Sequence, residues 1–153
     1  MELTADGTFF KVRASSVLNK SSDFQAKNMF VDDDSCWNSD GGSGENQGQW
    51  LLFDFLGKIV QLDSVSIMFQ GGFVGQEGTI DFLDSKVGEP RRTVNLDEVK
   101  RIEDSNDLQT WNIPPESEAD ARKAKFIRIN FPTSTDFYGR VTIYKLCLIG
   151  NVV

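Results

Sequence analysis

The stretch KFIRINF, at positions 125–131, decides the fold class of this chain. Ile127, Ile129 and Phe131 alternate with Phe126, Arg128 and Asn130, and in a β-strand such alternating positions point to opposite faces. One face is therefore predicted to enter a hydrophobic core, while Arg128 points outward. A strand that buries only one face needs a second layer to cover that face.

Short apolar runs bounded by Gly, Pro, Asp and Ser recur along the chain, which is typical of many short strands. We expect the main strands at 50–55, 64–70, 79–83, 110–113, 125–131 and 141–149. Helical signals are weak and are limited to 97–101 and 116–124. The pattern favours an all-β fold, an antiparallel jelly-roll β-sandwich, as one domain over residues 1–153. The polar segment 84–108 is interpreted as an insertion.

Composition and charge narrow the classes of function. Of the 153 residues, 39% are hydrophobic and 25% are charged, as in ordinary globular proteins. The net charge of -7 argues against direct binding to nucleic acid. No secretory signal or run of about 20 apolar residues is visible, so we expect an intracellular protein of the nucleus, the cytoplasm or both, without membrane contact. Residues 121–153 hold six bases and one acid, which leaves a locally basic face as an alternative to solvated bases.

The residues give little support for catalysis. The chain contains no histidine, so a general base at neutral pH would need a carboxylate, cysteine or lysine with a strongly shifted pKa. No serine or cysteine lies in a nucleophile motif. Cys36 has no Lys, Arg or His within three residues and is expected to be a buried, unreactive thiol. We therefore expect no enzyme, with a hydrolase as the least favoured alternative.

Several motifs, read in chain order, resemble a known family. They are ASSVL at 14–18, DDDSCW at 32–37 after Phe30, QWLLFDF at 49–55, FIRI at 126–129 and IYKLCLIG at 143–150. Together they resemble the discoidin, or coagulation factor type C, domains, which are galactose-binding-like jelly rolls. The resemblance implies that Trp37 and Trp50 fill the core, with stacking on a sugar as the alternative. Three sharper strings, CWNSD at 36–40, FQGGF at 69–73 and DFYGRV at 136–141, resemble a small family of nuclear receptor-associated proteins.

This narrower resemblance implies a non-catalytic protein-interaction module. The expected partner is a nuclear receptor, and the expected role is that of a transcriptional repressor that interferes with receptor dimerisation and DNA binding. The alternative is a carbohydrate-binding domain that uses the loop end of the jelly roll, as related domains do.

The discoidin resemblance also implies a structural calcium site in the loop before Trp37. The candidate ligands are Asp32, Asp33, Asp34 and Ser35, whose oxygen atoms suit calcium. The family pattern places a glutamate in the last strand where this chain has Cys147, a poor calcium ligand. We therefore favour a turn without a cofactor, in which Asp side chains cap main-chain N–H groups.

The loops at one end of the jelly roll form the candidate partner-binding site. The stretch TSTDFYGR at 133–140 places two aromatic residues and an arginine beside an acid, and these residue types anchor protein interfaces. The candidate residues are Phe73, Asp136, Phe137, Tyr138 and Arg140. In the competing interpretation, Phe137 or Tyr138 packs inward and Asp136 pairs with Arg140.

Overall fold

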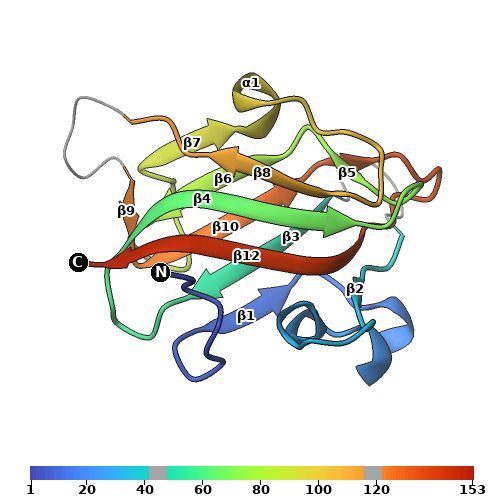
Figure 1. Cartoon of the computed structure of the whole chain (residues 1–153), viewed down its shortest axis with the longest axis horizontal. Coiled ribbons are helices and arrows are strands. Elements are labelled where there is room, and N and C mark those ends of the chain that lie inside the picture. The colour runs from blue at the N-terminus through green and yellow to red at the C-terminus, as the bar shows by residue number, and fades with distance from the viewer. Residues whose placement is uncertain (42–47, 116–121) are drawn as a thin grey trace.

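The computed structural model describes residues 1–41, 48–115 and 122–153, and it consists of two antiparallel sheets that face each other (Figure 1). The first sheet has the strand order β1-β3-β10-β6-β7, with β1 (Lys11–Ala14), β3 (Gln49–Asp54), β10 (Phe126–Phe131), β6 (Thr79–Leu83) and β7 (Arg92–Asn95). The second has the order β2-β12-β4-β8, with β2 (Trp37–Asn38), β12 (Thr142–Val152), β4 (Val60–Phe69) and β8 (Leu108–Asn112). The all-β sandwich prediction is confirmed.

Smaller elements complete the fold. The short strand β9 (Lys123–Ala124) pairs with β4, and β5 (Gly75–Gln76) pairs with β11 (Thr133–Ser134). The helical turns are η1 (Leu18–Lys20), η2 (Ser22–Phe24), η3 (Ala26–Phe30) and α1 (Leu96–Val99). The expected helix at 97–101 corresponds to α1. Of the helix expected at 116–124, positions 116–121 lie outside the described residues, and its end is wrong because 123–124 form β9.

The alternation in β10 produces the predicted burial. Ile127, Ile129 and Phe131 are at most 1% exposed, whereas Arg128 lies half-buried on the opposite face. The ring of Phe131 meets that of Phe69 from β4 edge to face, with centroids 5.6 Å apart. This contact joins the two sheets across the core, where burial of each such side chain contributes roughly 1.5–3 kcal/mol.

The tryptophans divide between the core and the surface. Trp37 is fully buried, and its indole Nε1 donates to the carbonyl of Ser16 at 3.0 Å, so the prediction of a core position is confirmed. For Trp50 the prediction is wrong. Leu51 and Phe53 fill the core from β3, and Trp50 lies half-buried on the outer face of that strand.

The segment 84–108 supplies the edge strand β7 and the turn α1, and it places Val94 and Leu96 in the core. Figure 1 shows the two chain ends side by side at one end of the sandwich, while the connection from β11 to β12 lies at the other. The candidate partner-binding residues belong to this second end. Among the described residues, no helix is long and apolar enough to cross a membrane.

Candidate functional site

The five candidate partner-binding residues come together at the end of the sandwich and are called here the loop-end cluster. The guanidinium carbon of Arg140 lies 5.2 Å from the ring centroid of Phe73 and 5.5 Å from that of Tyr138. The rings of Phe137 and Tyr138 meet edge to face at 5.2 Å. Asp136 pairs with Arg140, as the competing interpretation expected.

Hydrogen bonds within the connection between β11 and β12 fix its conformation. The hydroxyl of Ser134 donates to the carbonyl of Arg140 at 2.6 Å and accepts from the N–H of Asp136 at 3.0 Å. The N–H of Gly139 donates to the carbonyl of Asp136 at 3.0 Å. Gly139 has φ +82°, a backbone conformation that favours glycine. The cluster therefore stands on a closed turn.

The ion pair between Asp136 and Arg140 joins the two ends of this turn. Arg140 donates from Nε to Oδ2 of Asp136 at 2.9 Å and from Nη2 to Oδ1 at 3.3 Å, and its main-chain N–H donates to Oδ2 at 3.1 Å. These hydrogen bonds hold the pKa of Asp136 below its usual range and raise the pKa of Arg140. The pair is charged at neutral pH, and it holds the guanidinium between the rings of Phe73 and Tyr138.

Neither aromatic of the tip packs inward. Phe137 is 93% exposed and Tyr138 is 64% exposed. Two adjacent exposed rings on a closed turn form a small apolar projection, which is the kind of surface that marks an interaction site.

The FQGGF string forms the floor of the cluster. The N–H groups of Gly71 and Gly72 donate to side-chain oxygens of Asn106 at 2.7 Å and Asp104 at 2.8 Å. The carbonyl of Phe73 accepts from the N–H of Thr142 at 3.0 Å. Sequence reasoning missed the contribution of 104–106, because that segment showed no pattern of its own.

The CWNSD string packs against the same turn. Ser39 is fully buried, and its hydroxyl accepts from the N–H of Val141 at 2.8 Å. A Cβ on Gly41 would lie 2.6 Å from the carbonyl oxygen of Tyr138, so only glycine fits there without a shift. The three sharper strings, CWNSD, FQGGF and DFYGRV, therefore meet at one place in the fold.

The aspartate loop before Trp37 is closed by its own hydrogen bonds. Oδ1 of Asp33 accepts from the N–H of Ser35 at 2.8 Å and from the Ser35 hydroxyl. These bonds, above all the one from the hydroxyl, hold the pKa of Asp33 below its usual range. Asp32 and Asp34 are exposed. Within the described residues, no group of three or more His, Cys, Asp or Glu side chains is placed to hold a metal ion.

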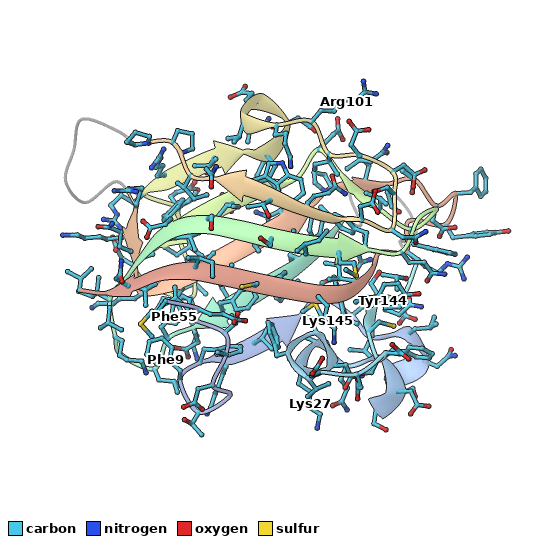
Figure 2. All side chains as sticks on the ribbon, viewed as in Figure 1. Phe9, Lys27, Phe55, Arg101, Tyr144 and Lys145 are labelled. Carbon is cyan, nitrogen blue, oxygen red and sulfur yellow. The ribbon has the colours of Figure 1, made fainter. Side chains whose placement is uncertain are left out.

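A lysine supplies positive charge to the same loop. Nζ of Lys145, labelled on β12 in Figure 2, donates to the carbonyl of Asp33 at 2.7 Å and to that of Val31. A calcium ion in this loop would need main-chain carbonyls of this kind, and here they already bind an ammonium group. The residues present therefore do not fit a calcium ion.

The two cysteines are free and half-buried rather than fully buried. Burial raises the pKa of Cys147 to about 11 and also raises the pKa of Cys36. Neither thiol carries appreciable negative charge at neutral pH. This environment suits a structural role better than a redox or metal-binding role.

Several curated relatives match nearly the full length of the chain. The nuclear receptor 2C2-associated protein of Bos taurus is 36% identical over 141 residues, which cover 91% of this chain and 89% of that protein. The protein of the same name from Danio rerio is 37% identical with the same coverage. That from Homo sapiens is 35% identical over 145 residues, with coverage of 92% and 91%. This chain belongs to the nuclear receptor 2C2-associated protein family. No protein-family model matches it.

Solved structures show the fold of this family member. A chitosan-binding module of a Paenibacillus chitosanase/glucanase has a TM-score of 0.69 at 18% identity and covers 98% of this chain and 99% of its own. An F5/8 type C domain from Bacteroides fragilis has a TM-score of 0.67 at 18% identity, with coverage of 94% and 92%. A Clostridium perfringens module solved with GalNAc-β-1,3-galactose has a TM-score of 0.68 at 12% identity, with coverage of 97% and 99%. The discoidin-like, galactose-binding-like fold expected from the motifs is confirmed.

Proposed function

We propose that this family member is a non-catalytic protein-interaction module that binds a nuclear receptor through the loop-end cluster. Its relatives are named for association with nuclear receptor 2C2, and its structural neighbours are binding modules, which supports a binding role. We further propose that it acts inside the cell, in the nucleus or cytoplasm, as a repressor that limits receptor dimerisation and DNA binding.

The exposure of Phe137 and Tyr138, at 93% and 64%, carries this proposal. Aromatic residues and arginine dominate the energy of protein interfaces. The turn that holds them is already closed by the pair between Asp136 and Arg140. The turn would therefore lose little conformational entropy on binding. Most of the free energy gained by burying the two rings would then contribute to affinity.

The test is a binding titration of purified nuclear receptor 2C2 with the wild-type chain and the double variant Phe137→Ala/Tyr138→Ala. We expect the Kd to rise at least about thirtyfold, because hot-spot truncations cost about 2 kcal/mol or more. The matched control is Ile59→Ala, which removes an apolar side chain that is 40% exposed, from the β3–β4 connection outside the cluster. Thermal melts of all variants report folding.

Two results would overturn parts of the proposal. Unchanged affinity of the folded double variant would place the interface elsewhere. No binding by the wild-type chain would show that receptor association does not extend to this family member. A gel-shift assay of the receptor on its DNA site, with added chain, tests the repressor role: the wild type should reduce the shifted band, and the double variant should not.

Carbohydrate binding at the loop end is the alternative. It is supported by the fold that the chain shares with carbohydrate-binding modules. The polar groups of the cluster argue against it, because the Asp136 carboxylate and the Arg140 guanidinium are engaged with each other. A glycan array on which binding disappears with Tyr138→Ala would favour this alternative over the receptor.

A further inference from the structure

The outer face of the first sheet carries a cationic row that the proposed function does not use. Strand register places Arg13 of β1, Leu52 of β3 and Arg128 of β10 side by side, and Asp81 of β6 follows next. These positions alternate with the core residues, so their side chains share the face away from the core. Trp50 lies on the same face, two positions before Leu52 along β3.

Arg13 and Arg128 both form cation–π contacts with the indole ring of Trp50. The guanidinium carbon of Arg128 lies 5.3 Å from the indole centroid, and that of Arg13 lies 5.9 Å from it. Two hollows, of about 660 and 520 Å³, are both lined by Trp50 and Arg128. Trp50 and Arg128 border both hollows, and the two together are called here the sheet-face groove. Each hollow has the size of a typical ligand pocket.

The acidic side chains of this face are already engaged. Asp81 accepts from Nδ2 of Asn130 at 2.9 Å and from the hydroxyl of Thr93 at 2.7 Å. Asp54 pairs with Lys86 at 3.5 Å. Within residues 1–41, 48–115 and 122–153, neither Arg13 nor Arg128 forms an ion pair with a carboxylate.

A hydrogen bond to Asn130 orients the guanidinium of Arg128. Its Nε donates to Oδ1 of Asn130 at 2.8 Å, which leaves the two terminal nitrogens directed away from that bond. A guanidinium held in this way presents a planar pair of donors that matches a carboxylate. Arg13 is exposed and has the indole ring as its contact.

The neutral polar groups of the groove are occupied. Oε1 of Gln49 accepts from the hydroxyls of Ser15 and Ser16, and its Nε2 donates to the carbonyl of Asp40. The amide of Asn130 is bonded at both its oxygen and its nitrogen. A neutral sugar would find these amides already bonded. Among the described residues, the side-chain donors of the groove that remain are cationic groups and the indole N–H of Trp50, so negative charge is the main feature that selects a ligand.

We propose that the sheet-face groove binds an acidic peptide segment in which carboxylate side chains flank an aromatic or aliphatic one. The carboxylates pair with Arg13 and Arg128, and the apolar side chain covers Leu52, Trp50 and the 82% exposed Val87. Asp54, Glu77 and Asp81 line or border the groove. Lys86 offsets the charge of Asp54, but Glu77 and Asp81 still repel a continuous polyanion such as a phosphate backbone. A short peptide with two or three carboxylates avoids this repulsion.

The test is an NMR titration of the ¹⁵N-labelled chain with the peptide Ser-Asp-Asp-Phe-Asp-Leu-Ser. The indole N–H of Trp50 and the Nε–H of Arg128 should shift in a saturable way. The indole N–H groups of Trp37 and Trp111 are internal references, because both residues are buried and bonded to carbonyls. The control peptide has Asn in place of each Asp and should bind at least about tenfold more weakly.

Three variants locate the site. Arg13→Gln and Arg128→Gln should each weaken peptide binding at least about fivefold, and Arg13→Gln is the safer of the two for folding because its side chain is exposed. Arg101→Gln removes the same charge from an exposed side chain, labelled at the top of Figure 2, and should leave binding unchanged.

The proposal fails if the Trp50 indole does not shift, or if the Asn peptide binds as well as the Asp peptide. It also fails if glucuronate or inorganic phosphate shifts these signals at lower concentration than the peptide does, which would assign the groove to an acidic sugar or to phosphate. Because the groove lies outside the loop-end cluster, none of these results depends on receptor binding.

Discussion

The ammonium of Lys145 binds two main-chain carbonyls of the aspartate loop, the kind of group that a calcium ion in this loop would need. Its two carbonyl partners, those of Val31 and Asp33, come from the chain just after η3. A hydrogen bond from a charged donor is stronger than one between neutral groups. The loop is therefore held by a side chain of the protein, and we expect its geometry to be independent of the concentration of a metal ion.

Lys145→Met tests this interpretation at the scale of one residue. Methionine keeps most of the length of the side chain but leaves both carbonyls without this donor, so we expect a loss of about 1–3 kcal/mol in the free energy of unfolding, measured with urea. Lys27→Met is the control, because Lys27 is exposed and lies on η3 near the same loop (Figure 2). It should change stability by less than about 0.5 kcal/mol.

The same measurement with calcium or with EDTA completes the test. The unfolding midpoint of the wild-type chain should be equal in both. A midpoint that rises with calcium would mean that the ion displaces Lys145 from the loop, and the interpretation would then be wrong.

Single residues also show where sequence reasoning succeeded and where it stopped. The family resemblance implies a core position for Trp50, yet Trp50 shares its alternation with Asp54, and Leu51 and Phe53 occupy the opposite face. The alternation of residues 49–54 was visible in the sequence, and it decides which face of β3 carries Trp50. The contact of Lys145 was not visible, because it depends on how β12 lies against a loop more than a hundred residues away.

At the scale of elements, the long pair of β12 with β4 depends on one glycine. The register of this pair shifts between Ile149 and Gly150. A Cβ on Gly150 would lie 1.9 Å from the carbonyl oxygen of Gln61, which is main chain and cannot rotate away. The strands could accept a side chain here only by separating.

Gly150→Ala should therefore lower the free energy of unfolding by about 2–3 kcal/mol, the range of forced overpacking. Gly7→Ala is the matched control, since a Cβ there would have no atom within 4 Å. Urea unfolding of both variants provides the comparison. Equal stability of the two variants would show that the β4–β12 pair adjusts at no cost.

Some helices and strands could be predicted from the sequence, and others could not. β10 and β6 followed from alternation alone, since each buries its apolar positions. The 3-10 turns η1 to η3 carry no periodic signal, because their three to five residues are too few for one. The segment 84–108 looked like an insertion, but it supports the loop-end cluster through Asn106 and Asp104. Those bonds depend on tertiary contacts that no local pattern encodes.

At the scale of the whole molecule, shifted pKa values on both sides of neutrality shape the dependence of stability on pH. Hydrogen bonds lower the pKa of Asp6, Asp33 and Asp136, chiefly from the N–H of Thr8, the hydroxyl of Ser35 and the side chain of Arg140. Burial raises the pKa of Cys36 and Cys147. Each shift means that the folded and unfolded chains bind different numbers of protons over some range of pH.

The aspartates and the cysteines lower the stability of the folded chain at opposite ends of the pH range. As pH falls below about 4, the unfolded chain takes up protons that the three folded aspartates bind more weakly, so stability falls. As pH rises above about 8.5, the unfolded chain releases thiol protons that the folded chain still holds, so stability falls again. For Cys147 this loss continues until the folded pKa of about 11 is reached.

We therefore predict that the urea midpoint is flat between about pH 5 and 8 and declines on both sides. Asp136→Asn should make the acid decline shallower, because the lowered pKa of that carboxyl no longer contributes. Cys147→Ala should make the alkaline decline shallower, because it removes the thiol whose pKa is raised to about 11. If the alkaline decline kept its slope in Cys147→Ala, other groups would control it, and burial of this thiol would not be the cause.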